Sequence, residues 1–278
     1  NVAGIITAQA PVGLLVVVSA MGKTTDKLER ILKLALSNQD YMPTLTELKE
    51  YHHKIVNELF EKPALVLHKV DGYFNALKND LFSSHSFDKV YDQVVSTGEL
   101  ISSVILHYYL LSKNIASDWH DARNSICTDS SFREAKVDWA KSSTCISKLT
   151  SILEKSIVIT QGFIGKTEDG FTTTLGREGS DFSAAIFASC LNSEAVVIWK
   201  DVPGVMNADP KRIPTATVFE ELPFKEAAEM TYYGASVIHP KTIKPLANKG
   251  IPLYVKNFTD PTLPGTKIHE CTIDKLPP

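Results

Sequence analysis

The segment TTTLGREGSD, residues 172–181, holds the densest group of anion-binding residues in the sequence. Arg177 lies between two glycines, and an alanine-rich helix is expected to begin at Ser180. An arginine fork can hold a carboxylate or a phosphate, and the free N–H groups at the start of a helix attract the same charge. Taken singly, Arg177 could form only a surface ion pair, and Asp181 could only stabilise the helix start. Their combination in one glycine turn predicts a binding site for an anionic substrate.

A carboxylate stands at a comparable place in Ser96-Thr97-Gly98-Glu99, at the start of a second apolar helix. The glycine lets a ligand come close to the backbone, and the helix dipole favours an acid in the first turn. Glu99 could therefore serve only to stabilise the helix, or it could bind the ammonium group of a small substrate. The local sequence leaves both interpretations open.

A third candidate follows the apolar run AVVIW, residues 195–199. The run ends in Lys200-Asp201 and leads into the turn Pro203-Gly204 and a later basic cluster at 211–212. Such a loop could hold a nucleotide. Its signal is weak when taken alone, because Pro-Gly turns are common where no ligand binds.

Gly22-Lys23-Thr24 is similar to the second half of the phosphate-binding P-loop. That motif requires a glycine five residues before Gly22, and Val17 stands there, inside an expected strand. A P-loop kinase is therefore a minor alternative, which a loss of nucleotide binding in Lys23→Ala would favour.

Short buried strands that alternate with helices are expected to position these segments. The alternation predicts an α/β protein with a largely parallel sheet, whose ligands bind at the carboxyl ends of the strands. The stretch 26–91 is almost purely helical in pattern, which predicts a helical insertion in the N-terminal lobe. The strands are expected at 14–18, 157–160, 195–199 and 253–255, and the helices at 44–60, 99–112, 180–191 and 240–249.

Two further details of the organisation follow from local composition. Thr44 and Glu47 have the spacing of a capping box, which predicts the start of the first long helix in the insertion. The stretch 141–155 is rich in Ser, Thr and Lys and predicts a boundary near 150–156. The expected lobes are therefore residues 1–155 and residues 156–278.

Charge and cysteine usage narrow the class of protein. The formal net charge is −3 over 278 residues, which offers no field that would attract nucleic acid or an anionic membrane. No apolar run reaches the length of a spanning helix, and no set of metal ligands has a recognisable spacing. The four cysteines are scattered, as expected for reduced thiols in a cytoplasmic protein.

Several segments together resemble the aspartokinases of the amino-acid kinase superfamily. GREGSD combined with KDVPGV and YGASVIHP is far more specific than any one of these motifs. The resemblance implies a three-layer α/β/α sandwich around a mostly parallel sheet, with an amino-acid lobe followed by a nucleotide lobe. The segments occur in the family's order over essentially the whole chain: VVVSAMGKTTD, STGE, GFIG, TTTLGREGSD, IWKDVPGV, DPK, EAAEMTYYGASVIHP and PGT.

The same resemblance implies ATP-dependent phosphorylation of the side-chain carboxylate of L-aspartate, with Mg²⁺ as the accompanying ion. This reaction opens the biosynthesis of the aspartate-derived amino acids. By resemblance, Arg177 would bind a substrate carboxylate, Glu99 the ammonium group, and Asp181 would organise a catalytic lysine. Thr25 and Ser180 would complete the substrate site. The nucleotide would lie along Lys200, Asp201, Met206, Lys211, Ser236 and Val237. A homodimer or a higher homo-oligomer is also implied.

The sequence departs from the family pattern at a few places. The family's opening strand, Lys-Phe-Gly-Gly-Thr-Ser, and its regulatory domains are not found within residues 1–278. Lysine is common where Ser236 stands, threonine where Lys200 stands, and a small residue where Glu178 stands. Two alternatives are therefore kept: an amino-acid kinase acting on a glutamate-type substrate, and a non-catalytic ligand-binding domain that lacks the lysine loop.

Overall fold

The computed structural model describes residues 2–8, 13–209, 212–232 and 237–272. The chain divides into two compact units, one of residues 11–180 and one that joins residues 1–10 to residues 181–278. The division lies at Ser180 and Asp181, whereas the composition placed the lobe boundary near 150–156. A cut at 155 would separate the strand at 157–161 from both strands that pair with it.

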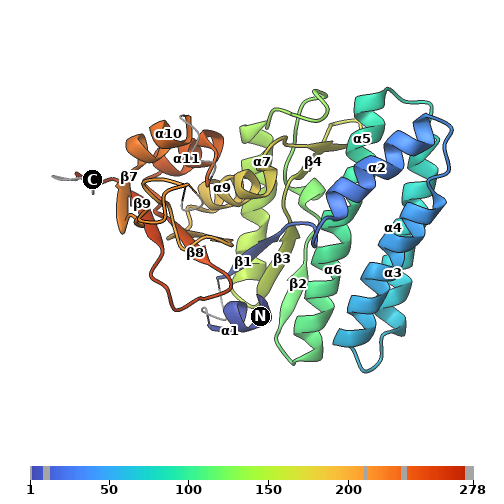
Figure 1. Ribbon diagram of the computed structural model, residues 1–278, viewed down its shortest axis with the longest axis horizontal. Helices are drawn as coiled ribbons and strands as arrows, with labels where there is room; N and C mark the ends of the chain where they lie inside the picture. The colour runs from blue at the N-terminus through green and yellow to red at the C-terminus, as the bar shows by residue number, and fades with distance from the viewer. Residues whose placement is uncertain (1, 9–12, 210–211, 233–236, 273–278) are drawn as a thin grey trace. The chain divides into compact units, whose positions relative to one another are not determined.

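The unit of residues 11–180 contains a three-stranded parallel sheet (Figure 1). Its order is β1 (Leu15–Val18), β3 (Ile157–Gln161) and β2 (Ser117–Trp119). The central strand β3 is buried along its whole length, as its continuous apolar run requires. The strands predicted at 14–18 and 157–160 are thus confirmed.

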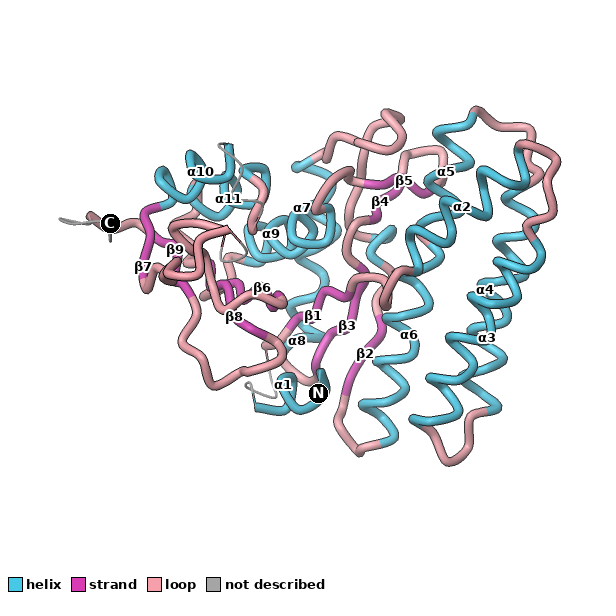
Figure 2. Tube along the Cα trace, in the orientation of Figure 1, coloured by secondary structure: helices cyan, strands magenta, loops and turns pink. Residues whose placement is uncertain are grey.

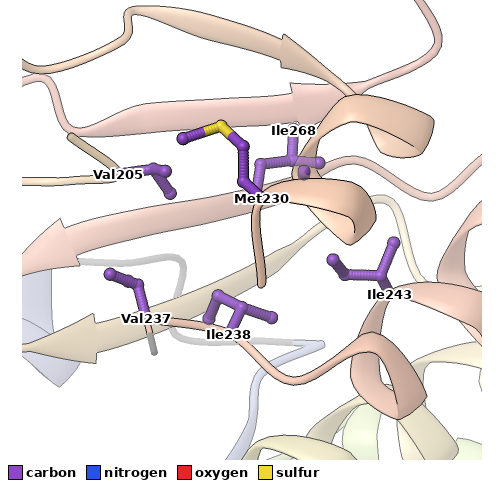
Figure 3. Close-up of a pocket in the computed structure, with 7 residues that line it drawn as sticks. Val205, Met230, Val237, Ile238, Ile243 and Ile268 are labelled. Carbon is purple, nitrogen blue, oxygen red and sulfur yellow. The ribbon is translucent and has the colours of Figure 1, made fainter. Parts of the chain in front are cut away.

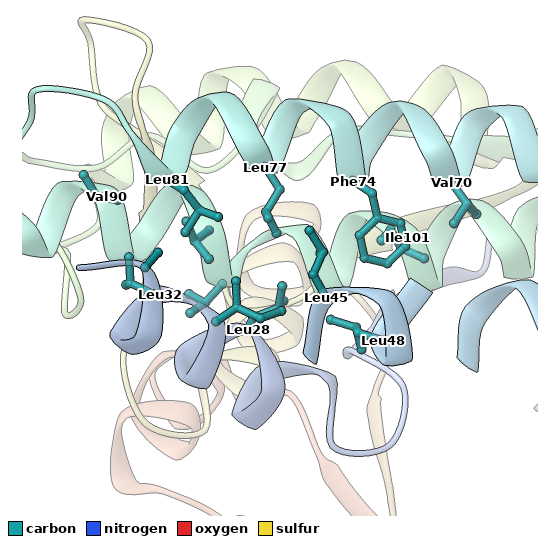
Figure 4. Close-up of a cluster of buried hydrophobic side chains, with 14 of the residues drawn as sticks. Leu28, Leu32, Leu45, Leu48, Val70, Phe74, Leu77, Leu81, Val90 and Ile101 are labelled. Carbon is teal, nitrogen blue, oxygen red and sulfur yellow. The ribbon is translucent and has the colours of Figure 1, made fainter. Parts of the chain in front are cut away.

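The predicted helical insertion is present as a set of long helices that share one apolar core (Figure 4). In Figure 1, α6 lies between the three-stranded sheet and the pair α3 and α4. Leu28, Leu48 and Phe74 are among the core side chains that are almost fully buried. The helices are α2 (Thr24–Leu36), α3 (Met42–Leu59), α4 (Ala64–Leu81), α5 (Phe87–Val95) and α6 (Thr97–Ser112).

The capping box predicted at Thr44 and Glu47 is wrong. Helix α3 begins at Met42, whose N–H donates to Oδ1 of Asp40 at 3.0 Å, and Pro43 in its first turn supplies a backbone angle that suits a helix start. Thr44 is therefore already inside the helix, and Glu47 instead binds Lys27 of α2, with Oε1 2.8 Å from Nζ.

Helices α5 and α6 follow one another almost without interruption over residues 87–112. By length and composition alone, this stretch could cross a membrane, with a mean hydropathy of 1.3 in its most apolar window. However, 72% of that window is buried inside the protein. Its apolar composition is therefore what a central helix packed on several sides requires.

Shorter elements complete the unit of residues 11–180. β4 (Ile164–Lys166) and β5 (Thr172–Thr174) form an antiparallel pair just before the glycine turn at 176–179. The remaining pieces are helices: η1 (Ala122–Asn124), α7 (Trp139–Ile146), η2 (Ser147–Leu149) and α8 (Thr150–Leu153).

The second unit has its own four-stranded sheet (Figure 2). β6 is parallel to β8, β8 is antiparallel to β9, and β9 is parallel to the edge strand β7. In order across the sheet, the strands are β6 (Val196–Lys200), β8 (Leu253–Asn257), β9 (Thr266–His269) and β7 (Glu221–Pro223). The helices are α1 (Val2–Ala8), α9 (Gly179–Leu191), α10 (Phe224–Tyr232) and α11 (Pro240–Ala247).

The predicted α/β class with mostly parallel sheets is confirmed. The strands predicted at 195–199 and 253–255 are β6 and β8, and the helix predicted from Pro240 is α11. Gly250 follows that helix with φ of 64°, a conformation that glycine adopts without strain.

Candidate active site

Glu99 lies in the first turn of α6 with only 4% of its surface exposed. Its Oε1 accepts a long hydrogen bond, 3.4 Å, from the N–H of Ala20. Its Oε2 is buried and has no hydrogen-bond partner among the described residues. Burial raises the pKa of this carboxyl to about 8, while hydrogen bonds from the backbone oppose the rise. A buried carboxyl with one unused oxygen is suited to a cationic ligand.

The loop that follows β1 packs directly on the start of α6. A Cβ atom added at Gly98 would lie 2.9 Å from Cβ of Ala20 and 3.0 Å from Cγ2 of Thr24. Ser102 of α6 strengthens this contact, because its hydroxyl donates to the carbonyl of Ser19 at 2.7 Å. Glycine is therefore needed at position 98 to bring Glu99 against the end of the strand.

The loop that follows β3 also contacts the end of β1. The N–H of Gly162 donates to the carbonyl of Val18 at 2.9 Å, which ties the ends of β1 and β3 together. A Cβ atom at Gly162 would lie 2.6 Å from Cβ of Ser180. Ser180 and Glu99 are therefore both held at the carboxyl edge of the three-stranded sheet, as their positions in the sequence predict. Thr25 is half-buried in the first turn of α2, the helix that begins after β1.

Arg177 is exposed in the turn that precedes Ser180. Its neighbours Gly176 and Glu178 both have positive φ, 73° and 53°. A Cβ atom at Gly176 would lie 3.0 Å from Cγ of Glu134, so the turn is backed by the loop around that residue. The guanidinium is thus carried on a tight turn beside the edge that holds Glu99.

Asp92 holds the chain just before this turn, and no local pattern around it predicts this role. Its side chain is fully buried, and Oδ2 accepts hydrogen bonds of 2.9 Å from the N–H groups of Arg133 and Thr174. Its Oδ1 accepts from the hydroxyl of Thr174 at 2.7 Å. Asp92 therefore ties α5, which leads into the helix of Glu99, to β5, which leads into the turn of Arg177.

In the unit of residues 181–278, the predicted residues Asp181 and Lys200 form an ion pair. Nζ of Lys200 lies 2.8 Å from Oδ2 of Asp181, and the side chains are 23% and 16% exposed. Asp181 comes from the first turn of α9 and Lys200 from the last position of β6. The structure thus brings together Asp181, one of the two residues predicted to take part in catalysis, and Lys200, which is predicted to bind the nucleotide.

The loop after β6 is held by Thr266. A Cβ atom at Gly204 would lie 2.6 Å from Oγ1 of Thr266, and that oxygen accepts from the N–H of Val205 at 2.8 Å. Asp201 is exposed at the start of the loop, and Met206 pairs with Val218 in a short β-bridge.

Two predicted nucleotide residues, Lys211 and Ser236, lie outside the described residues. A third, Val237, lines a small apolar cavity of about 10 Å³ (Figure 3). Ile238, Ile243, Met230 and Ile268 also contribute to its wall. A space of that size and character is a packing gap rather than a substrate site.

The P-loop alternative fails on the position of Val17. Val17 is paired with Thr160 inside the parallel sheet, so its backbone cannot curl around a phosphate. Gly22 has φ of 55°, and a Cβ atom there would lie 2.8 Å from the hydroxyl oxygen of Tyr51. The glycine therefore serves the turn into α2 and its contact with Tyr51.

Comparison with known proteins agrees with the predicted resemblance. Residues 2–257 match the family described as "Amino acid kinase family". The bifunctional aspartokinase/homoserine dehydrogenase 2 of Arabidopsis thaliana is 34% identical over 276 residues, which is 96% of this chain and 30% of that protein. The lysine-sensitive aspartokinase 3 of Escherichia coli is 39% identical over 188 residues, 67% of this chain and 41% of that protein.

Solved structures give the same result. A crystal structure of E. coli aspartokinase III in complex with aspartate and ADP superposes with a TM-score of 0.91 at 30% identity. The match covers 98% of this chain and 61% of that chain. The chain therefore spans about a third of the length of the plant relatives and three fifths of the bacterial structure. The motifs occur in order, Glu99 and Ser180 lie at the strand ends, and the family match covers nearly the whole chain. This protein therefore belongs to the amino acid kinase family, and the relatives named above are aspartokinases.

Proposed function

We propose that this chain is the catalytic region of an aspartate kinase, which transfers the γ-phosphoryl group of ATP to the side-chain carboxylate of L-aspartate. The observation that carries the proposal is the buried carboxyl of Glu99, whose Oε2 has no partner among the described residues. An α-ammonium group supplies the missing donor and the opposite charge. The E. coli structure with aspartate and ADP supports the same substrate pair.

On the substrate side, each predicted residue has a distinct task. Glu99 binds the ammonium group, and Arg177 binds a carboxylate through its guanidinium fork. The hydroxyl groups of Thr25 and Ser180 orient the substrate by hydrogen bonding. No covalent enzyme intermediate is needed, because the aligned carboxylate attacks the γ-phosphorus directly as ADP leaves, with compensation of charge by the protein.

On the nucleotide side, Lys200 offers a cation to the phosphates of ATP, and Asp181 holds its ammonium group in place through the 2.8 Å ion pair. Mg²⁺ fits this set of residues as an ion carried by the phosphates, since it keeps to oxygen ligands and needs few from the protein. The exposed carboxylate of Asp201 is the group that could hold it. When bound, the ion would offset the negative charge of the phosphates.

The test is aspartate-dependent release of ADP at saturating MgATP, in a protein that carries this sequence behind the family's opening lysine strand. Glutamate and N-acetylglutamate serve as control substrates. Turnover with aspartate alone is expected. Turnover with glutamate instead would support the glutamate-type kinase and would contradict the substrate assignment.

Calorimetry distinguishes a non-catalytic ligand-binding domain. Because the pKa of Glu99 is about 8, this group is mostly protonated at pH 7, and an ammonium partner would lower that pKa. Binding of aspartate should therefore release close to one proton, measured as a dependence of the binding enthalpy on the buffer. Binding with proton release but no turnover would favour the non-catalytic domain.

We also propose that the protein acts in the cytoplasm as a homodimer or a higher homo-oligomer. Cys127, Cys145 and Cys271 are free thiols, which suits a reducing compartment. Cell fractionation tests the location, and light scattering tests the oligomeric state.

A further inference from the structure

Three residues of the types that bind zinc converge at the edge of the four-stranded sheet. Glu221, His269 and Cys271 each offer one ligand atom, and these atoms all lie within 4.8 Å of one another. Nε2 of His269 is 3.3 Å from Oε2 of Glu221. Imidazole nitrogen, thiolate sulfur and carboxylate oxygen are together a donor set for Zn²⁺ and similar ions, whereas Mg²⁺ and Ca²⁺ prefer oxygen alone.

The alternation of the strands explains why these side chains meet. β7 pairs in parallel with β9, with Leu222 opposite Ile268, and both of these side chains are fully buried. Glu221 and His269 each neighbour a core residue in the sequence, so they point to the other face of the sheet. Cys271 follows His269 by two residues and continues the same alternation.

The electrostatic surroundings of the cluster favour a cation. The carboxylates of Glu221, Glu226 and Glu270 place negative charge around the Cys271 thiol, and the ammonium group of Lys267 offsets part of it. The side chain of Glu221 is 55% exposed, so an ion can reach the cluster from solvent.

One buried polar atom of the cluster and one of the nearby Glu226 lack a hydrogen-bond partner within the described part of the chain. Nε2 of His269 and Oε2 of Glu226 have no hydrogen-bond partner among the residues that the structure describes. The 3.3 Å approach of His269 to Glu221 is close enough for an ion pair but does not form a hydrogen bond. A bound cation would satisfy the nitrogen directly and would offset the buried carboxylate.

We propose that Glu221, His269 and Cys271 form a binding site for Zn²⁺ or a chemically similar divalent transition-metal ion. The fourth position of a tetrahedral site is completed by water. None of the three residues is assigned to aspartate or to the nucleotide, so the proposal is independent of the kinase activity.

The test is titration of the nucleotide-free chain with Co²⁺, which reports a thiolate ligand through a sulfur-to-cobalt charge-transfer band, and with Zn²⁺ by calorimetry. The wild-type protein should bind one equivalent at this site with a thiolate signature. Cys271→Ser should abolish that band, and His269→Asn and Glu221→Gln should each weaken Zn²⁺ binding by about tenfold or more.

Two control variants separate this site from the other thiols. Cys190→Ser removes a thiol of α9 that is not in the cluster and should leave the band unchanged. Cys127→Ser removes a thiol that neighbours Cys145 and should also leave it unchanged. A wild-type protein without the band, or a band that survives in both Cys271→Ser and His269→Asn, would overturn the proposal. Circular dichroism of each variant confirms that the fold is intact.

Discussion

At the scale of the residue, Glu99 shows how burial prepares a group for its ligand. The carboxyl lies in the first turn of a helix, where the dipole favours negative charge, yet the loss of solvent outweighs the dipole and keeps the group protonated near neutral pH. A ligand that brought a positive charge would restore the charged form. The proposed substrate site should therefore favour ammonium compounds over neutral analogues of the same shape.

Burial of Glu99 also makes the stability of the ligand-free protein depend on pH. The pKa rises from an ordinary 4.5 to about 8 on folding, so the folded state binds this proton more tightly than the unfolded state does. The resulting stabilisation is fully present below pH 4.5 and is lost as the pH rises through 8, with a total of roughly 3–5 kcal/mol. The measurement is the free energy of unfolding in urea between pH 5 and pH 8.5.

Glu99→Gln should remove this pH dependence, because glutamine stays neutral at every pH. Glu61→Gln, at an exposed position of the same unit, is the matched control and should keep it. If the slopes of wild-type protein and Glu99→Gln coincide, the buried carboxyl is charged in the folded state and this account of the site is wrong.

At the scale of the element, Asp92 couples a helix to a strand. Its three accepted hydrogen bonds join α5 and β5, the two elements that lead to Glu99 and to Arg177. Asp92→Ala leaves the buried N–H of Thr174 and the part-buried N–H of Arg133 without this acceptor and should destabilise the protein by about 2–4 kcal/mol. It should also raise the KM for aspartate while leaving the KM for ATP unchanged.

Asp92→Asn is the informative companion, since its amide oxygen can still accept from the backbone. Its KM for aspartate should therefore be much closer to the wild-type value than the raised KM of Asp92→Ala. Equal rises in both KM values would show that Asp92 supports the fold in general and not the turn of Arg177.

Close packing at the strand ends leads to a prediction about glycine. Gly162→Ala places a methyl group 2.6 Å from Cβ of Ser180 and should destabilise the protein by about 1–3 kcal/mol. Gly72→Ala is the control, because the position lies inside α4 with no atom within 4 Å of the added Cβ. That change should stabilise the protein by about 0.5–1 kcal/mol. Thermal unfolding should show a lower Tm for Gly162→Ala and a higher Tm for Gly72→Ala. A Gly162→Ala protein as stable as the wild type would contradict the close contact with Ser180.

The limits of prediction from the sequence are also clearest at this scale. Runs such as LLVVV at 14–18 and the glycine turn at 176–179 carry local signals, so the strand and the turn could be predicted. Asp92 could not, because its role depends on partners that lie 41 and 82 positions away in the sequence. His269 and Cys271 meet Glu221 only through the register of β7 and β9, which no local pattern specifies. The capping box failed because Pro43 starts its helix earlier.

At the scale of the whole molecule, aspartate and MgATP should protect different amides from hydrogen exchange. Glu99, Arg177 and Ser180 belong to the unit of residues 11–180, whereas Asp181 and Lys200 belong to the other unit. In hydrogen exchange, aspartate alone should protect amides near 20, 98–99 and 162, and MgATP alone should protect amides near 181 and 200–206. Protection by aspartate confined to residues 181–278 would contradict the assignment of the substrate site.

The division of the chain has a consequence for its synthesis. Residues 11–180 are continuous and can fold as soon as they leave the ribosome, but α1 belongs to a unit whose other residues begin at 181. The apolar side chain of Ile6, buried in the finished protein, must wait until the residues from 181 onward have been made. Prior folding of those residues shortens the effective loop that has to close. Because translation runs from the N-terminus, α1 docks after the unit of residues 11–180 has folded. Until then its apolar side chains are exposed and chaperones can bind them.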